Sequence, residues 1–214
     1  MDPPTDWVVN GGRYALDFDG TNDFVNLGNP AVVRSGSPFF VCAWFRTATN
    51  AFQSIVAKSF FGGATHRWWL STNTGAVEAN GTSGAGGNTA SFTTTYTDGN
   101  WHHIGGLYSG SVLTLFYDGR PRATTAITQM EPSAYTLLFG KYNDGSGGAT
   151  GSSFQFAGQI DDVRAYNTAM TAADIRQLWQ LGRGNMPLVR KRRYAEQVVA
   201  ATNRRRRLIC GSNC

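Results

Sequence analysis

The sequence predicts an all-β protein built from two packed antiparallel sheets. Short apolar or alternating runs recur about every ten residues, and Gly, Asn and Asp clusters separate them, as in sandwich folds. The 214 residues include 26 Gly, and 13% of them are aromatic, so the composition supplies both turns and large core side chains. This length is sufficient for one large β domain with its own core. No run of 18 apolar residues occurs, and the sequence therefore predicts no membrane insertion.

Apolar and β-branched residues place the expected strands between these turn clusters. The sequence Tyr117-Asp118-Gly119-Arg120 predicts a tight hairpin, because Asp-Gly tolerates the positive φ angles of a primed turn. Two Gly-rich stretches, 81–87 and 144–151, are predicted as loops. In chain order, the expected strands cover residues 14–18, 24–26, 39–46, 54–58, 68–71, 76–80, 90–95, 101–108, 112–118, 137–141 and 154–166.

One short helix is expected near the carboxyl end, at residues 172–181. Thr171 is a suitable N-cap, Asp174 suits the first turn, and Gly182 offers a left-handed stop. The residues that would face the sandwich are Ile175, Leu178, Trp179 and Leu181.

Charge divides the chain into two parts. Residues 183–214 hold nine Lys or Arg and one Glu, a net charge of +8, whereas residues 1–182 hold ten basic and thirteen acidic residues, a net charge of −3. The sequence thus predicts a domain at 1–182 and a basic carboxyl-terminal arm at 183–214, with a weak helical pattern at 194–202. Such an arm either binds an acidic partner or remains a solvated end. The candidate partner-binding residues are Arg190, Lys191, Arg192, Arg193, Arg204, Arg205, Arg206 and Arg207.

Four stretches occur in order along the chain: ALDFDGTNDFVNLG, FFVCAWFRT, DGNWHHIGGLYSGSVLTLFYDG and FAGQIDDVRAYNTAMTAADIRQLW. Together they resemble the laminin-G-like branch of the concanavalin A-like lectin/glucanase superfamily, over residues 14–181. The resemblance implies two antiparallel sheets packed as a jelly roll. It implies function less narrowly, because this fold serves lectins, adhesion modules, hydrolases and structural proteins.

The resemblance also implies a calcium ion, because family members often hold one where the first FDG turn meets the late IDD strand. It places Asp19, Asn22 and Asp23 near Asp161 or Asp162. Ca²⁺ binds six to eight oxygens, and carboxylates, amides and exposed carbonyls supply them. The alternative is a turn whose side chains bond only to its own backbone.

Paired carboxylates for glycoside hydrolysis are not evident. Such chemistry needs two carboxylates across the scissile bond, and Glu78, Glu131 and Glu196 are isolated in the sequence. Asp161 and Asp162 are consecutive, so a regular strand would turn them to opposite faces. The His pair in WHH falls in a strand and is interpreted as structural. The sequence therefore favours a protein that is not an enzyme.

Recognition of a glycan is the remaining function for the domain. Lectins stack aromatic rings on sugars and bond the hydroxyls with amide, carboxylate and basic groups. The segment 58–69, which includes Arg67 and Trp69, and the loop after Gly140 supply such groups. Because neighbours alternate, at most one of Trp68 and Trp69 is exposed. The candidate sugar-binding residues are Lys58, His66, Trp68, Tyr142, Asn143 and Asp144.

The expected protein is thus a lectin-like module that the basic arm mounts on a larger assembly of protein subunits. Stand-alone domains of this type without signal peptides resemble those of bacteriophage and bacterial surface proteins, which indicates an extracellular or virion-surface location. The rival class is a structural decoration or filament subunit without sugar binding. Nucleic-acid binding by the arm is least favoured, because its basic and aromatic residues are not interleaved.

Overall fold

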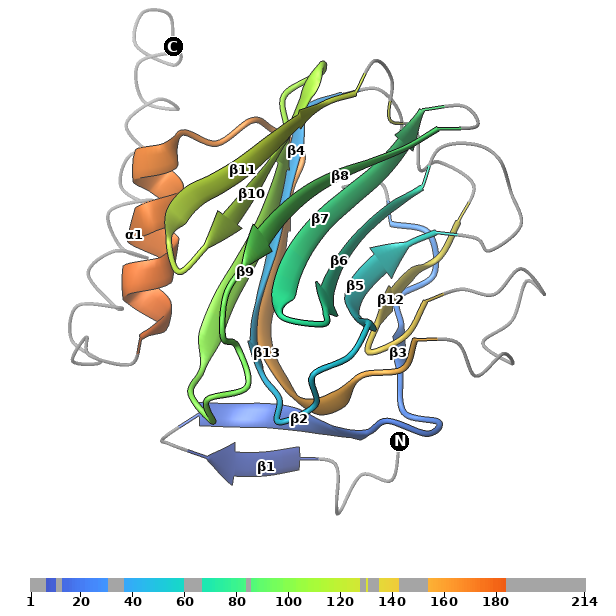
Figure 1. Ribbon diagram of the computed structural model, residues 1–214, viewed down its shortest axis with the longest axis vertical. Coiled ribbons are helices and arrows are strands. Elements are labelled where there is room, and N and C mark those ends of the chain that lie inside the picture. Colours follow the sequence, from blue (N-terminus) through green and yellow to red (C-terminus); the bar gives the residue numbers. More distant parts are fainter. Residues whose placement is uncertain are drawn as a thin grey trace, which may run out of the picture.

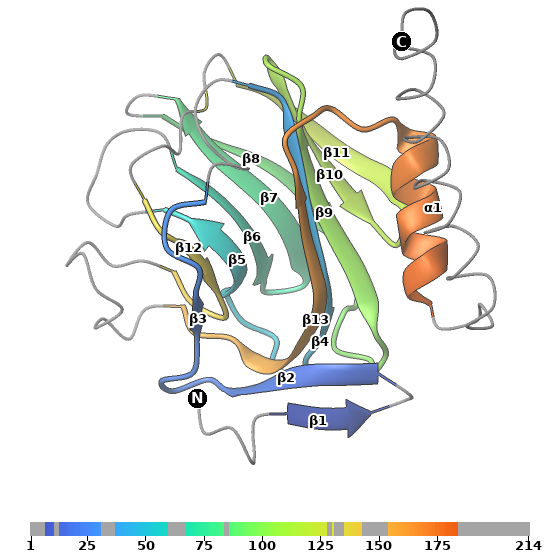
Figure 2. The ribbon, with the colours of Figure 1, turned by 180° about the vertical axis from the view of Figure 1, so that it is seen from behind.

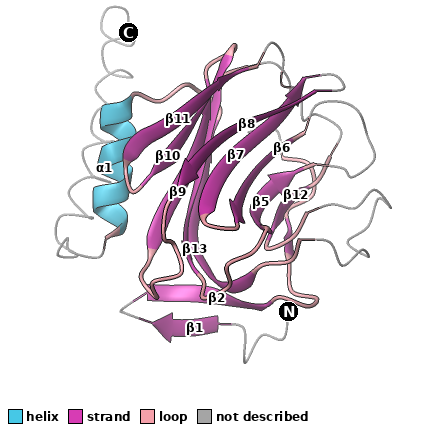
Figure 3. Ribbon diagram, in the orientation of Figure 1, coloured by secondary structure: helices cyan, strands magenta, loops and turns pink. Residues whose placement is uncertain are grey.

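The fold is a two-layer β-sandwich with one helix at its side (Figure 1). The computed structural model describes residues 7–10, 13–30, 37–59, 67–83, 86–127, 130, 135–142 and 154–183. Strands account for nearly all of its regular structure (Figure 3). No helix in these ranges is both long enough and apolar enough to cross a membrane.

Two sheets form the layers, and every neighbouring pair of strands is antiparallel. This confirms the predicted antiparallel sandwich. The seven-stranded sheet has the order β1 (Trp7–Asn10), β2 (Arg13–Asp19), β13 (Ala157–Tyr166), β4 (Phe39–Arg46), β9 (His102–Tyr108), β10 (Val112–Tyr117) and β11 (Arg120–Ala126). The six-stranded sheet has the order β3 (Val25–Asn26), β12 (Leu137–Phe139), β5 (Gln53–Lys58), β6 (Trp68–Asn73), β7 (Ala76–Ser83) and β8 (Gly86–Thr93).

One apolar core fills the space between the sheets. Phe39 of β4 meets Trp68 of β6 edge to face, with ring centroids 5.5 Å apart. Phe45, also on β4, packs edge to face on Phe156 at 6.4 Å. Such aromatic pairs contribute about 0.5–1.5 kcal/mol each beyond the area they bury. The core therefore fixes which face of each strand is turned inward.

The helix α1 (Ala172–Gly182) lies beside β10 and β11, on the side of the seven-stranded sheet that faces away from the six-stranded sheet (Figures 1 and 2). Thr171 caps it as predicted: its Oγ1 accepts the Asp174 N–H at 3.2 Å, and Asp174 Oδ2 accepts the Thr171 N–H at 3.2 Å. Ile175 is buried against Phe40 and Cys42 of β4, so the predicted apolar face of the helix does contact the sheet.

The prediction of a left-handed stop at Gly182 is wrong. Gly182 is the last residue of α1, and Arg183, with φ −66° and ψ 0°, is the C-cap. A Cβ atom at position 182 would overlap the Trp44 indole. Gly182 therefore serves the close approach of the helix to β4 rather than a change of backbone direction.

The prediction that the Gly-rich stretch 81–87 is a loop is only partly correct. Strands β7 and β8 extend into this stretch from both sides. Gly81 pairs with Trp68 on one side and with Asn88 on the other. A Cβ atom at Gly81 would lie 2.7 Å from Ile127 Cδ1. Glycine leaves room here for Ile127, the residue after β11, and composition alone cannot distinguish such a close contact from a turn.

Strands β1 and β11 were not expected from the sequence. Both are edge strands of the seven-stranded sheet. Pro121 in β11 is compatible with an edge, since no further strand requires its missing N–H. The predicted Asp-Gly hairpin connects β10 to β11, with φ 48° at Asp118 and φ 72° at Gly119.

Several sequence predictions lie outside the described residues. These are the loop at 144–151, the helical pattern at 194–202 and the candidate residues His66, Asn143, Asp144, Arg190, Lys191, Arg192, Arg193, Arg204, Arg205, Arg206 and Arg207.

Candidate functional site

The outer face of β6 combines an aromatic side chain with polar ones. Trp68 and Leu70 belong to the core, so Trp69, Ser71 and Asn73 point to the opposite side of the sheet. On β7, the core residues Val77 and Ala79 leave Glu78 and Asn80 on this same outer face. The two central strands thus present one continuous outer surface.

Trp68 cannot stack on a ligand, in contrast to the sequence prediction. Its side chain is 0% exposed, and it packs on Phe39 inside the sandwich. Trp69 is half-buried on the outer face. The sequence correctly predicts that the two tryptophans point to opposite faces, but Trp69 and not Trp68 lies on the outer face.

A hydrogen-bonded network covers the centre of the outer face. Asn73 Nδ2 donates to Glu78 Oε1 at 3.0 Å, and Asn80 Nδ2 donates to Ser71 Oγ at 3.1 Å and to Glu78 Oε2 at 3.4 Å. Thr89 of β8 donates from Oγ1 to Asn80 Oδ1 at 2.7 Å. Each partner limits the rotation of the next, so the polar groups are held in fixed orientations.

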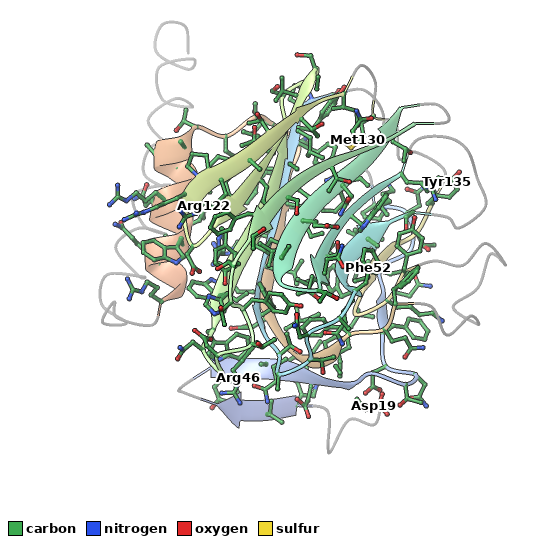
Figure 4. All side chains as sticks on the ribbon, in the orientation of Figure 1. Asp19, Arg46, Phe52, Arg122, Met130 and Tyr135 are labelled. Carbon is green, nitrogen blue, oxygen red and sulfur yellow. The ribbon has the colours of Figure 1, made fainter. Side chains whose placement is uncertain are left out.

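A row of aromatic rings continues from Trp69 along the same face. Trp69 meets Tyr142 edge to face at 5.4 Å, Tyr142 meets Phe154 at 5.9 Å, and Phe154 meets Phe52 at 4.6 Å. The Phe154 carbonyl accepts the Ser54 N–H at 2.9 Å, which holds this residue beside β5. Figure 4 labels Phe52 at the start of β5. Phe154 is 38% exposed, so the row reaches the surface at this end.

Arg67 lies next to the aromatic row and is anchored on both sides. Its backbone N–H donates to Thr82 Oγ1 at 2.8 Å, and its carbonyl accepts the Thr82 N–H at 2.9 Å. Its guanidinium donates from Nη1 to the Tyr142 hydroxyl at 3.2 Å and lies 5.9 Å from the centroid of Trp69. Arg67, Trp69 and Tyr142 therefore form one contiguous group.

Two further sugar-binding candidates are buried, so the prediction that they contact a ligand directly is corrected. Lys58 is 0% exposed, and its pairing with Trp68 places both on the inner face. Tyr142 is 3% exposed and serves instead to hold Arg67 and Trp69. The alternation of Trp68 and Leu70 with Trp69 and Ser71 was the signal that identifies Trp69, because apolar residues share the core face.

The acidic turn after β2 uses its side chains to bond its own backbone. Asp19 Oδ1 accepts the N–H groups of Thr21 at 2.7 Å and Asn22 at 3.2 Å, and the Thr21 bond holds the pKa of Asp19 below its usual value. Asp23 Oδ2 accepts the Asp19 N–H at 2.9 Å. Figure 4 shows Asp19 at the end of β2. The alternative turn interpretation accounts for these contacts.

The late aspartate doublet lies further along β13 than the predicted calcium site requires. Asp19 pairs with Ala157, whereas Asp161 is four residues onward, about 13 Å at 3.3 Å per residue. Asp162 forms a two-point ion pair with Arg164, at 2.7 and 2.9 Å. No group of three or more His, Cys, Asp or Glu in the described ranges could hold a metal ion. The five predicted ligands do not form one set and do not fit a calcium ion.

Asp161 and Asp162 nevertheless line one cavity of about 180 Å³, although a regular strand would separate them. The pairing of β13 with β4 shifts register between Asp161 and Arg164, and Asp162 has φ 49°. Trp7 and Tyr14, which are 61% and 74% exposed, complete the open side of this cavity. The bulge therefore changes the faces that the sequence pattern assigned.

The two histidines of WHH point to opposite sides of β9. The His102 ring lies between Asp98, 3.0 Å from Nε2, and Asp118, 3.1 Å from Nδ1, and stacks on Tyr117 at 5.1 Å. His103 is 1% exposed and meets Trp44 edge to face at 5.4 Å. Both rings are built into the packing between strands and turns.

Only one carboxylate lies in the strands of the six-stranded sheet. Glu78 is the single acidic residue among their sequences, and both of its oxygens accept hydrogen bonds from amides, those of Asn73 and Asn80. Glycoside hydrolysis requires a second carboxylate facing the first. The described strands of this sheet do not supply one.

The fold is the two-sheet β-sandwich of the concanavalin A-like class. A family model described as the concanavalin A-like lectin/glucanases superfamily, of the laminin G type, matches residues 19–176. The chain belongs to this superfamily, as the sequence resemblance implied. No curated protein sequence matches the chain.

Solved structures of the same fold include carbohydrate-binding modules. The Ruminococcus gnavus sialidase module CBM40, bound to α2,3-sialyllactose, is 15% identical with a TM-score of 0.62, over 77% of this chain and 95% of that one. Domain 4 of the Geobacillus stearothermophilus arabinanase AbnA, in complex with arabinotriose, is 14% identical with a TM-score of 0.58, over 80% and 79%. Mouse laminin α1 domains LG4-5 are 20% identical with a TM-score of 0.54, over 73% of this chain and 44% of that one. At these identities the similarity concerns the fold.

Proposed function

We propose that the chain is a non-catalytic glycan-binding module whose ligand binds on the outer face of β6 and β7. The observation that carries this proposal is the half-buried Trp69 beside a fixed polar network. An aromatic ring can cover the apolar face of a sugar, and oriented amides and hydroxyls can bond its equatorial groups. Glu78 has no facing carboxylate in the strands of this sheet, which supports binding rather than hydrolysis.

The accessible members of the surface are the expected contacts. Arg67, Trp69 and Asn73 are half-buried, and Thr89 and Ser91 of β8 are exposed. Glu78 and Asn80, at 8% and 2% exposure, act behind them by holding Asn73 and Thr89. The sialyllactose and arabinotriose complexes of the two bacterial modules support a sugar as the ligand, since they share this fold.

The test is a glycan array followed by calorimetry with the full chain and a Trp69→Ala variant. Loss of a stacked ring should weaken binding about tenfold or more, because central aromatic contacts contribute about 2 kcal/mol or more. Trp7→Ala is the matched control, since Trp7 is exposed on β1 of the other sheet and lies outside this surface. Its affinity should equal that of the unaltered chain. If the full chain binds no glycan, the rival structural role is favoured.

We also propose that residues 183–214 anchor the module on a larger assembly, at an extracellular or virion surface. The support is the charge division of the sequence, with a net charge of +8 in this segment against −3 in the preceding residues. Basic segments mixed with apolar residues suit docking on an acidic partner surface. Protein subunits are the proposed partners of the arm, and glycans those of the domain.

A further inference from the structure

We propose that the glycan carries a carboxylate, as sialic and uronic acids do, and that Arg67 binds it. This inference rests on the proposed function, because it concerns the same outer face. It adds the charge of the ligand and the residue that selects for it.

Arg67 is distinguished by what its guanidinium lacks. In the described ranges it forms no ion pair, and its buried Nε has no hydrogen-bond acceptor. Arg164, by contrast, has both an Nε and an Nη bond to the carboxylate of Asp162. The guanidinium charge of Arg67 is therefore not paired with a carboxylate in the described ranges.

The only carboxylate in the strands of this sheet does not bond to Arg67. Both oxygens of Glu78 are instead bound to the amides of Asn73 and Asn80. The acidic residue of the face is thus already satisfied, and the positive charge of Arg67 remains available. Arg67 is therefore a cation of this face with which an anionic ligand can pair.

The guanidinium is also held in one place. The two backbone hydrogen bonds with Thr82 fix the chain at Arg67, and the Tyr142 hydroxyl accepts from Nη1 at 3.2 Å. The Tyr142 contact uses one N–H of Nη1, so the second N–H of Nη1 and those of Nη2 can bind a planar group, whereas Nε is buried. Arginine binds carboxylates through two parallel N–H donors of this kind.

Trp69 would place a stacked sugar ring beside the guanidinium of Arg67. The guanidinium carbon lies 5.9 Å from the Trp69 centroid, and both groups contact Tyr142. A sugar stacked on Trp69 would therefore extend a ring substituent towards Arg67. A carboxylate on that ring meets the arginine, whereas a hydroxyl leaves the charge unpaired.

The experiment compares matched charged and neutral ligands by calorimetry with the full chain. The pairs are 3′-sialyllactose against lactose and a galacturonic acid trisaccharide against galactotriose, with the sialyllactose methyl ester as an uncharged isostere. We expect the acidic member of at least one pair to bind about 10- to 100-fold more tightly, as for a charge-assisted hydrogen-bonded pair. The difference in affinity between acidic and neutral ligands should narrow in high salt, because Arg67 is only partly buried and salt ions screen its charge.

Variants assign this preference to Arg67. Arg67→Gln should bind the acidic and neutral members of each pair equally. Arg67→Lys should retain only part of the preference, because lysine keeps the charge but lacks the planar fork. Arg122→Gln is the control, since this arginine also packs over an aromatic ring, Phe92, but belongs to β11 of the other sheet. Melting curves show whether each variant is folded.

The outcomes separate this inference from the function on which it rests. If the full chain binds acidic and neutral glycans equally and Trp69→Ala binds neither, the inferred preference for a carboxylate is wrong, but the proposed glycan-binding function stands. Equal binding of 3′-sulfolactose and 3′-sialyllactose would overturn selectivity for a carboxylate. If none of the ligands binds, the proposed function itself fails.

Discussion

His102 shows how a single side chain can couple stability to pH. Burial disfavours its charged form, but the hydrogen bonds to Asp118 and Asp98 prevail and raise its pKa. Burial also disfavours the ionised form of Asp98, yet hydrogen bonds from Asn100 and His102 lower the pKa of this carboxyl to about 2. The charged ring therefore links the segment before β9 to the hairpin turn after β10.

We predict that the stabilisation from His102 is full below its unfolded pKa of about 6.5 and is lost as the pH rises through the higher folded value. His102→Asn should therefore lower the melting temperature by a few degrees at about pH 5.5 and by less at about pH 9. Asp98 stays ionised at both pH values, since its folded pKa lies well below them. Thermal denaturation across this range provides the measurement, and a gap independent of pH would contradict the prediction.

The choice between Trp68 and Trp69 shows what a residue pattern can and cannot determine. Alternation correctly predicted that at most one lies on the outer face, and the apolar Leu70 in phase with Trp68 indicates which. The role of Tyr142 could not be predicted in this way, because its hydroxyl bonds to Arg67, 75 positions away. Asp162 is a similar case, since a bulge, not the sequence pattern, brings it to the same cavity as Asp161.

The helix α1 depends on the missing side chain at its last residue. In most helices Gly→Ala is stabilising, by up to about 1 kcal/mol. At Gly182 we predict the opposite sign, a loss of about 1–3 kcal/mol, because the new Cβ would overlap Trp44. Urea denaturation measures the change. Gly87→Ala is the control: no atom lies within 4 Å of its added Cβ, and it should alter stability by no more than about 0.5 kcal/mol.

Elements with a local chemical signal were the predictable ones. Thr171 and Asp174 mark the start of α1, and Asp118-Gly119 marks the β10–β11 hairpin. Strand β11 was not predicted because it contains Pro121, and a proline argues against a strand in the sequence. Proline is incompatible with a central strand, but β11 is an edge strand, where proline is tolerated. The composition at 81–87 predicts a loop, because the contact between Gly81 and Ile127 joins residues that are far apart in the sequence.

The arrangement of the whole sandwich brings the two ends of the domain together. β2, near the amino terminus, pairs with β13, which precedes α1. This pairing agrees with the proximity of the FDG and IDD segments that the family resemblance implied. It does not by itself bring the five predicted ligands together, because strand adjacency fixes neighbours and not the position of each carboxylate along them.

Removal of the basic arm should change assembly and leave the domain folded. A chain ending at Arg183 retains the C-cap of α1, whose N–H bonds the Trp179 carbonyl at 3.2 Å. We predict a smaller particle in light scattering than for the full chain, with an unchanged melting temperature. Replacement of Arg204, Arg205, Arg206 and Arg207 by Gln in the full-length chain should have an intermediate effect. Equal particle masses would contradict the anchoring role.

The bond between Arg67 and Tyr142 joins segments 75 positions apart, so its two partners meet only after both have been incorporated into the sandwich. An unfolded chain cannot present this combination of groups. Ligand binding and conformational stability are consequently linked. A ligand that binds only the native state, at a concentration of about one hundred times its Kd, adds about 2.7 kcal/mol to the free energy of unfolding. Occupancy of the face can thus be detected as thermal protection of the entire molecule, without any label on the sugar.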